Sequence, residues 1–209
     1  MIKISTSILS AKDRIKCINK LNNTTTDYIH IDVMDGLFVP NYQLPVKEVN
    51  ELGRISNKPL DIHLMMEEPE AFIEHLSITN IDCITFHIEI DDEKNISDLI
   101  NIIRKHGYKT GLAIKPKTDI NLLDRYLDII DKVIIMSVEP GFGGQKFIEN
   151  TIGRINTLRK KRPDIIIEVD GGINDETINK VKDNIDIAVV GSYITNNEDY
   201  QKAINNIKN

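Results

Sequence analysis

Short runs of β-branched and other apolar residues alternate with longer amphipathic runs along the whole chain. We expect strands at residues 2–5, 28–33, 59–64, 83–87, 109–114, 132–136, 165–169 and 187–190. Helical periodicity is strongest over residues 11–21, 69–76, 96–106 and 146–161. Eight strand–helix units predict an α/β fold, a closed parallel (β/α)8 or TIM barrel with right-handed crossovers. A doubly wound open sheet is the main structural alternative.

The organisation of the chain favours a single domain over residues 1–209, because no linker, low-complexity tract or shift in composition divides it. This length lies at the short end of the range for barrels. Hydrophobic residues make up 41% of the chain, enough for a sizeable core without disulfides. Cys17 and Cys83 fall in an amphipathic and an apolar run, so we expect buried free thiols, which are typical of a reducing compartment.

Charge and hydropathy exclude several classes of partner. The formal net charge is -6, and no basic stripe with interleaved aromatic residues appears, so we expect no nucleic-acid partner. Residues 1–12 contain no apolar stretch long enough for a signal peptide, and no later run is long enough to span a membrane. We therefore expect a cytoplasmic location and no membrane association.

Three predicted strands carry chemically unusual side chains on the face that points into the barrel. Their outward series is apolar: Ile29, Ile31, Val33, Leu60, Ile62, Leu64, Ile167 and Val169. Their inward series is polar or carries sulfur: His30, Asp32, Met34, Asp61, His63, Met65, Glu168 and Asp170. Buried polar groups are costly unless they have partners, and barrel enzymes keep their active sites at the carboxyl ends of the strands. This pattern indicates a site rather than packing.

His30, Asp32, His63 and Asp170 form the strongest group of candidate ligands. Two imidazoles and two carboxylates suit a borderline divalent ion such as Zn2+, Fe2+, Mn2+ or Co2+. The alternative is that the histidines are satisfied core residues and the aspartates cap loops, but four such residues at predicted strand ends favour a metal site. Asp32 and Asp170 also come from distant strands. A pair of this kind suits epimerisation beside a ketone, in which one group removes a proton and the other returns one to the opposite face.

Glycine-rich segments near other strand ends suit phosphate binding. Residues 138–147 would let the backbone approach a phosphate closely, although the segment lacks the Lys-Ser/Thr ending of a nucleotide P-loop. A flexible connecting loop is the alternative, and a lid that closes over the substrate would satisfy both interpretations. Gly171 and Gly172 follow the seventh strand, and Gly191 and Ser192 follow the eighth, where barrels commonly bind phosphate.

Three methionines and three further histidines occupy less specific positions. Met34, Met65 and Met136 fall at inward strand ends, as core filler or as an apolar wall beside a reacting carbon. His87 also lies at an inward strand end, whereas the other two histidines, at positions 75 and 106, lie on helical patterns and are expected at the surface.

The motifs along the chain resemble those of the ribulose-phosphate 3-epimerases, which are TIM barrels of the ribulose-phosphate-binding type. The matching segments are residues 7–11, 29–36, 59–65, 85–89, 138–147, 167–172 and 190–192. They occur in the order found in that family and cover nearly the whole chain.

The resemblance implies an isomerase that interconverts D-ribulose 5-phosphate and D-xylulose 5-phosphate in the pentose phosphate pathway, with one divalent metal ion and no organic cofactor. It implies that Asp32 and Asp170 are the acid/base pair and that both also bind the metal together with His30 and His63. It implies homo-oligomers, dimers or hexamers. The implied substrate contacts are Ser7, His63, Met34, Met65, Met136, Gly141, Phe142, Gly143, Gly144, Gly171, Gly172, Gly191 and Ser192.

Several positions depart from the family pattern. Thr6 replaces a usual proline, Leu37 stands where His or Arg is frequent, residues 41–45 lack the usual Thr-Phe-Gly-Pro, and Lys117 occupies a common glycine position. Three alternatives therefore stay open. They are a D-allulose-6-phosphate 3-epimerase, a lyase of the hexulose-phosphate synthase or orotidine-phosphate decarboxylase type, and a sugar-phosphate-binding barrel without catalysis. The lyases usually carry an Asp-x-Lys pair on a strand, and this chain has His30-Ile31-Asp32 instead.

Overall fold

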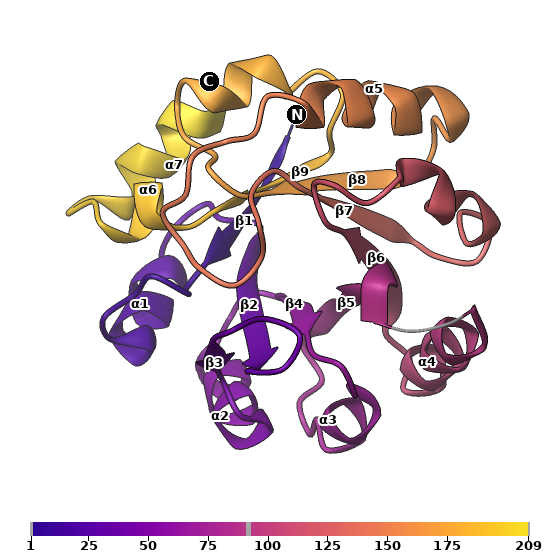
Figure 1. Ribbon diagram of the computed structural model, residues 1–209. Coiled ribbons are helices and arrows are strands. Elements are labelled where there is room, and N and C mark those ends of the chain that lie inside the picture. Colours follow the sequence, from indigo (N-terminus) through magenta and orange to yellow (C-terminus); the bar gives the residue numbers. More distant parts are fainter. Residues whose placement is uncertain (1, 91–92, 209) are drawn as a thin grey trace.

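The computed structural model describes residues 2–90 and 93–208 and has the predicted barrel architecture (Figure 1). Its strands are β1 (Lys3–Ser7), β2 (Tyr28–Asp35), β3 (Tyr42–Gln43), β4 (Leu60–Met65), β5 (Ile81–His87), β6 (Lys109–Ile114), β7 (Lys132–Met136), β8 (Ile166–Asp170) and β9 (Ile187–Val190). All except β3 run parallel, and the barrel closes because β1 pairs with both β2 and β9. The open-sheet alternative is therefore wrong.

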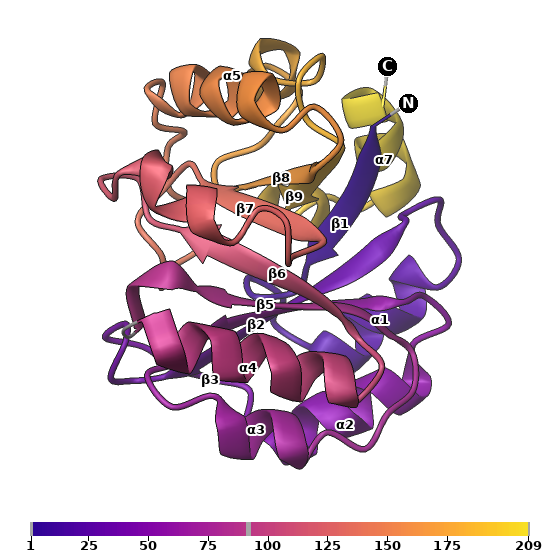
Figure 2. The same cartoon turned by 90° about the vertical axis from the view of Figure 1, so that its right-hand side faces the viewer.

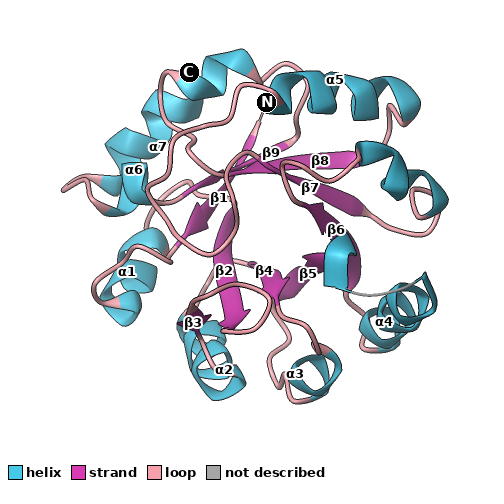
Figure 3. Ribbon diagram, viewed as in Figure 1, coloured by secondary structure: helices cyan, strands magenta, loops and turns pink. Residues whose placement is uncertain are grey.

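Helices surround the barrel on all sides (Figures 1 and 3). They are α1 (Arg14–Leu21), α2 (Val46–Ile55), α3 (Glu70–Glu74), α4 (Glu93–Lys105), α5 (Thr151–Lys161), α6 (Ser192–Thr195) and α7 (Tyr200–Lys208), with the 3-10 helices η1 (Ile88–Ile90), η2 (Ile120–Arg125) and η3 (Thr177–Lys180). Between β6 and β7, and between β8 and β9, only η2 and η3 cover the barrel. The eight-fold repeat is thus complete in strands but reduced in helices.

Element boundaries differ from the predicted ones mainly at helix starts. The predicted helix over residues 146–161 begins only at Thr151, because the backbone N–H of Ile148 donates to the Ser137 carbonyl in the preceding loop at 2.8 Å. The predicted helix over residues 11–21 begins at Arg14, where the Asp13 side chain caps it by accepting the N–H of Lys16 at 3.0 Å. The strands β6, β7 and β9 have the predicted bounds.

The apolar core lies between the barrel and its helices. The outward residues Ile29, Ile31, Ile62 and Val169 are fully buried or nearly so there, as the alternation predicts. Figure 2 shows α3 and α4 on one flank of the barrel and α5 on the opposite flank. The core therefore forms a ring outside the strands, which leaves the barrel interior to polar side chains and short apolar clusters.

Two further expectations concern thiols and membranes. Cys17 and Cys83 are buried and free, as predicted. None of the helices in the described part of the chain combines the length and apolar character that a membrane span requires.

Candidate functional site

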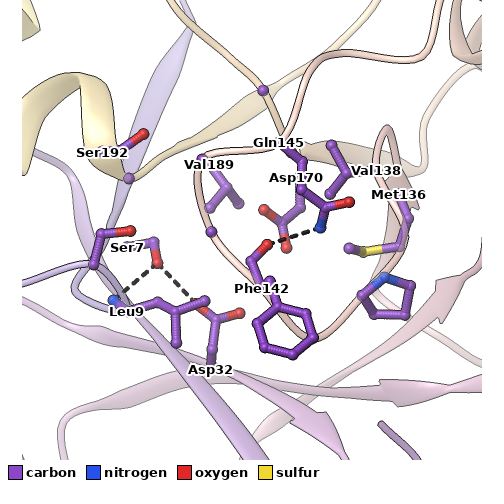
Figure 4. Close-up of a pocket in the computed structure, with 18 of the residues that line it drawn as sticks. Ser7, Leu9, Asp32, Met136, Val138, Phe142, Gln145, Asp170, Val189 and Ser192 are labelled. Carbon is purple, nitrogen blue, oxygen red and sulfur yellow. Dashed lines mark hydrogen bonds between the residues drawn. The ribbon is translucent and has the colours of Figure 1, made fainter. Parts of the chain in front are cut away.

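A cavity of about 70 Å³ opens at the carboxyl ends of the strands (Figure 4). The strand residues that line its floor are Ser7, Asp32, Met34, Met65, Met136, Asp170 and Val189. The remaining lining comes from the loops after β1, β7, β8 and β9. In Figure 4 the side chains of Asp32 and Asp170 point into the same space, although β1 and β9 separate their strands in the barrel.

Two histidines and two aspartates meet beneath this cavity. The Nε2 atom of His30 lies 3.4 Å from Asp32 Oδ1 and 3.8 Å from Asp170 Oδ2. The Nδ1 atom of His63 lies 3.4 Å from the same two oxygens. One ligand atom from each of the four residues lies within 4.8 Å of all the others. The structure thus brings together the four candidate metal ligands that the sequence singles out.

The geometry and the chemistry of this group fit a divalent ion. Tetrahedral coordination with bonds of about 2.0–2.1 Å places neighbouring ligand atoms about 3.4 Å apart, close to the observed separations. Both facing nitrogens, His30 Nε2 and His63 Nδ1, are buried and have no hydrogen-bond partner. Buried polar atoms in proteins nearly always have partners, so an orphaned pair aimed at two carboxylates fits a site that could hold a metal ion.

The electrostatics of the group also favour a cation. Burial alone would lower the pKa of His30, but the charges of Asp32 and Asp61 raise it well above its usual value. Burial alone would raise the pKa of the Asp32 carboxyl, but His30 and His63 lower it instead. Positive charge in the imidazole pair is thus stabilised by the carboxylates, and a divalent ion would compete with protons for the same atoms.

Each imidazole is held by its second nitrogen. His30 Nδ1 donates to Asp61 Oδ2 at 2.9 Å, and His63 Nε2 lies 2.9 Å from His87 Nε2. His87 Nδ1 in turn lies 3.0 Å from Glu89 Oε2. Burial lowers the pKa of His87 to about 4, so its neutral ring can donate to Glu89 and accept from His63. This chain leaves the His63 Nδ1 lone pair facing the two aspartates.

Ser7 positions the carboxylate of Asp32 from the neighbouring strand. Its hydroxyl donates to Asp32 Oδ2 at 2.7 Å and accepts the backbone N–H of Leu9 at 3.3 Å, as Figure 4 shows. The other carboxylate oxygen, Oδ1, is the one that faces the two histidines. Asp32 therefore has a fixed orientation before any substrate enters.

The three predicted methionines line one part of the cavity. Met34, Met65 and Met136 are each no more than 2% exposed. Met34 and Met65 pack with Val39 in a small cluster inside the barrel mouth. Met136 belongs to a second small cluster with Val138, so methionines line the cavity from two separate apolar clusters, at the inward strand ends that the sequence predicts.

The glycine-rich loop after β7 covers the cavity. Gly141, Phe142, Gly143 and Gly144 all line it. Gln145 holds the loop in shape, because its side-chain amide donates to the carbonyl of Phe142 at 2.8 Å, drawn in Figure 4, and to that of Glu139 at 2.7 Å. Gly144 has a φ of 74°, a backbone conformation that residues other than glycine rarely adopt.

Gly171 and Gly172, after β8, line the cavity and leave no room for a side chain. A Cβ atom on Gly172 would lie 2.5 Å from the backbone nitrogen of Phe147, and one on Gly171 would lie 2.9 Å from that of Val138. Their backbones therefore lie against the loop after β7, which brings the two loops together. Gly191 and Ser192 line the same cavity from the loop after β9, although the helix that follows, α6, has only four residues.

The departures from the family pattern lie around the site rather than in it. Thr6 is buried in β1, with its hydroxyl 2.7 Å from that of Thr26, while Leu37 and Lys117 are exposed. Asn41 has a direct link to the cavity, because its side-chain amide donates to the Gly141 carbonyl at 2.8 Å. Leu44 has a φ of 59°, the one non-glycine positive value in the described residues.

Some residues of the site were not among the predicted ones. Asn41, Glu89, Val138, Gln145 and Val189 contact the cavity or the residues that form it. Glu89, Val138 and Gln145 lie in the segments 85–89 and 138–147 that the sequence singles out, but their side chains were not predicted to be part of the site. Asn41 and Val189 gain their neighbours only through the fold. Of the other histidines, His87 lies behind His63, and those at positions 75 and 106 are exposed, as expected.

The chain matches the model of the ribulose-phosphate 3 epimerase family over residues 3–195. The ribulose-phosphate 3-epimerase of Bacillus subtilis (strain 168) is 36% identical, with 100% of this chain and 99% of that protein covered. The chloroplastic ribulose-5-phosphate-3-epimerase of Arabidopsis thaliana is 37% identical, with 99% of this chain and 76% of that protein covered.

Solved structures share the fold at much lower identity. A 3-hexulose-6-phosphate synthase from Salmonella typhimurium has a TM-score of 0.71 at 16% identity and covers 99% of this chain and 96% of its own. KGPDC from Streptococcus mutans has a TM-score of 0.71 at 13% identity, with 100% of this chain and 96% of its own covered. At this identity the likeness shows the barrel fold alone.

Proposed function

The chain belongs to the ribulose-phosphate 3-epimerase family, and on this premise we propose that it is an isomerase that interconverts D-ribulose 5-phosphate and D-xylulose 5-phosphate in the pentose phosphate pathway. Two relatives with epimerase names align over 99% or more of the chain. The observation that carries the proposal is the buried pair of unpartnered imidazole nitrogens facing Asp32 and Asp170 under a glycine-rich loop.

Asp32 and Asp170 are the proposed acid/base pair. In an epimerisation beside a ketone, one carboxylate removes the C3 proton and the other delivers a proton to the opposite face. The two aspartates lie on β2 and β8 and point into one cavity, an arrangement that gives each a different approach to a substrate between them. Ser7 keeps the Asp32 carboxylate oriented through its 2.7 Å hydrogen bond.

His30, Asp32, His63 and Asp170 would hold one divalent ion, Zn2+, Fe2+, Mn2+ or Co2+. When bound, such an ion stabilises the negative charge that develops on the substrate oxygens in the enediolate. The chain itself contributes the orientation of the ligands through Asp61 and His87. Met34, Met65 and Met136 would exclude water from the reacting carbon.

The phosphate end of the substrate is proposed to bind the backbone of Gly141–Gly144, Gly171, Gly172 and Gly191 with the hydroxyl of Ser192, while Ser7 contacts the sugar. The loop after β7 lines the cavity through Gly141, Phe142, Gly143 and Gly144, so it lies within reach of a phosphate bound there. We therefore propose that residues 140–145 act as a lid that closes on the phosphate.

The organisation of the protein is also part of the proposal. We propose that residues 1–209 form one domain, that the protein assembles as a homo-oligomer, a dimer or a hexamer, and that it works in the cytoplasm. The buried free thiols of Cys17 and Cys83 support a reducing compartment. Analytical ultracentrifugation measures the mass of the assembly directly. A monomer at the concentrations used for the activity assays would contradict the proposed homo-oligomer.

The test is turnover of D-ribulose 5-phosphate beside D-allulose 6-phosphate, with a chelator and after addition of each candidate metal ion. Metal-dependent epimerisation that is faster on the pentulose supports the proposal and identifies the active ion. Faster turnover of the hexulose would change the assignment to an allulose-6-phosphate 3-epimerase. No turnover of either sugar by metal-loaded protein would favour a sugar-phosphate-binding barrel without catalysis.

A further inference from the structure

A second group of charged side chains lies inside the barrel, beneath the four candidate metal ligands. Of the lysines whose burial is described, Lys132 alone is buried, at 3% exposure. It begins β7, and its ammonium group donates to the carboxylate of Asp61 on β4 and to Glu168 Oε2 on β8, the latter at 2.5 Å. Burial alone would lower the pKa of Lys132, but these two carboxylates raise it well above its usual value.

This group has the composition of a metal site, but its cation is a side chain. One ligand atom each from His30, Asp61 and Glu168 lies within 4.8 Å of the others. Lys132 contacts both carboxylates and so places one positive charge between them. Lys132 thus occupies the position of the cation in the lower group, where it bonds Glu168 through Oε2 while Glu168 Oε1 has no hydrogen-bond partner.

The network terminates on the candidate metal ligand His30. Asp61 Oδ2 accepts from His30 Nδ1 at 2.9 Å and from the Ser5 hydroxyl at 2.8 Å, while the other oxygen of Asp61 accepts from Lys132. Glu168 Oε1 lies 3.4 Å from the same His30 nitrogen. Because Nδ1 carries the hydrogen that Asp61 accepts, the lone pair of Nε2 points at Asp32 and Asp170.

We propose that Lys132 is a positioning residue that acts on His30 through Asp61. Its ammonium group bridges Asp61 and Glu168, so it fixes the Asp61 carboxylate as the acceptor for His30 Nδ1–H and thereby presents His30 Nε2 to the metal. Without it, Asp61 and Glu168 would face each other in the barrel interior with no bridging donor, so the Asp61 carboxylate would rotate away from His30. This inference rests on the metal site of the proposed function.

The first test is the zinc dissociation constant, measured by competition with a chromogenic chelator for the wild-type protein, Lys132→Met and Lys109→Met. Loss of a partner behind a metal ligand typically weakens metal binding by about 10–100-fold, and we expect Lys132→Met to fall in that range. Lys109→Met is the matched control, because Lys109 begins the adjacent β6 and pairs with Asp82 at 2.8 Å at the surface. Its zinc affinity should stay within about twofold of wild type.

The second test separates positioning from a general loss of stability. In zinc-loaded protein labelled with ¹⁵N-histidine, the His30 Nδ1–H and His63 Nε2–H protons are each held by a hydrogen bond and are expected to give separate resonances. In Lys132→Met the His30 resonance should broaden by exchange or disappear while the His63 resonance persists. A purely structural role for Lys132 would change both resonances or neither.

The outcomes are distinct. Wild-type protein that binds no zinc would contradict the metal site of the proposed function itself. Wild-type binding with unchanged affinity and an unchanged His30 resonance in folded Lys132→Met would overturn the role of Lys132 alone. If Lys132→Met does not fold, Lys132→Gln retains one donor group at this position, and the same two measurements decide by the same criteria.

Discussion

The two proposed proton-transfer residues differ in their immediate surroundings. The side chain of Asp32 is 6% exposed and accepts a hydrogen bond from Ser7, while the side chain of Asp170 is 14% exposed. Both carboxylates face the same two imidazoles. The histidines favour the charged form of the buried Asp32 carboxylate, whereas Asp170 is more accessible to solvent. Two carboxylates in different surroundings can take different roles, one as the acid and one as the base.

Replacing Asp32 or Asp170 with Asn should remove most of the epimerase activity while the fold survives. We expect kcat to fall by about 10²–10⁴-fold, the usual contribution of a positioned acid or base, because the amide cannot transfer the C3 proton. Steady-state turnover with zinc-saturated protein measures the effect, and circular dichroism checks folding. Asp82→Asn, at the partly exposed surface end of β5, is the control. Near-normal turnover by either site variant with metal bound would contradict the assignment.

Cys83 should be chemically inert in the native protein. Burial raises the pKa of its thiol to about 12, so the reactive thiolate is only about 10⁻⁴ of the population at pH 8. The Cys83 thiol loses its proton at about pH 9 in the unfolded chain but only at about pH 12 in the folded protein. Its contribution to the free energy of unfolding is therefore fully present below about pH 9 and is lost as the pH rises toward 12. Titration with a thiol reagent at pH 8 should label Cys83 only after denaturant is added. Rapid native labelling would mean that this part of β5 opens.

At the scale of elements, the loops after β2, β7 and β8 form one connected mouth. Asn41 reaches the loop after β7 through the Gly141 carbonyl, and Gly172 lies against the backbone at Phe147. Arg14 on α1 contacts Gln43 of β3 and Glu48 of α2, so the loop after β2 is itself held in place. The departures at residues 41–45 therefore bear on how the lid is held.

Asn41→Ala should raise KM more than it lowers kcat. The variant loses one hydrogen bond that holds the lid, worth about 0.5–1.5 kcal/mol, so we expect KM to rise by roughly 2–12-fold. Steady-state kinetics on D-ribulose 5-phosphate gives both constants. Asn23→Ala is the control, because Asn23 makes a similar bond to the Asn19 carbonyl at the exposed end of α1. Equal KM values for the two variants would show that the Asn41 hydrogen bond does not hold the loop after β7 for substrate binding.

For the whole molecule, the periodicity of the sequence predicts the fold and most of the site. Alternation along residues 28–33 and 59–64 predicts which side chains enter the barrel, because a strand has only two faces. The role of Lys132 could not be predicted in this way, since a lysine that begins a strand resembles an exposed end. Its partners lie 71 and 36 residues away in the sequence, and only the closed barrel brings them together.

Metal binding should stabilise the whole barrel, because the proposed ligands join β2, β4 and β8. At a free zinc concentration about 100 times the dissociation constant, the gain is about 2.7 kcal/mol. For a domain of this size that corresponds to a rise in Tm of roughly 5–10 °C. Scanning calorimetry with and without zinc measures it, with the His30→Gln/His63→Gln variant as the control that should not respond. An equal Tm shift in that variant would place the zinc elsewhere.

Proton transfer between two carboxylates on opposite faces of C3 determines the fate of the C3 hydrogen in D2O. Metal-loaded protein is incubated with D-ribulose 5-phosphate, and both sugars are analysed at low conversion by NMR and mass spectrometry. We predict that D-xylulose 5-phosphate carries solvent deuterium at C3, while unreacted D-ribulose 5-phosphate keeps its hydrogen, because the removing and the delivering groups are different. Product that retains the original C3 hydrogen would contradict the account.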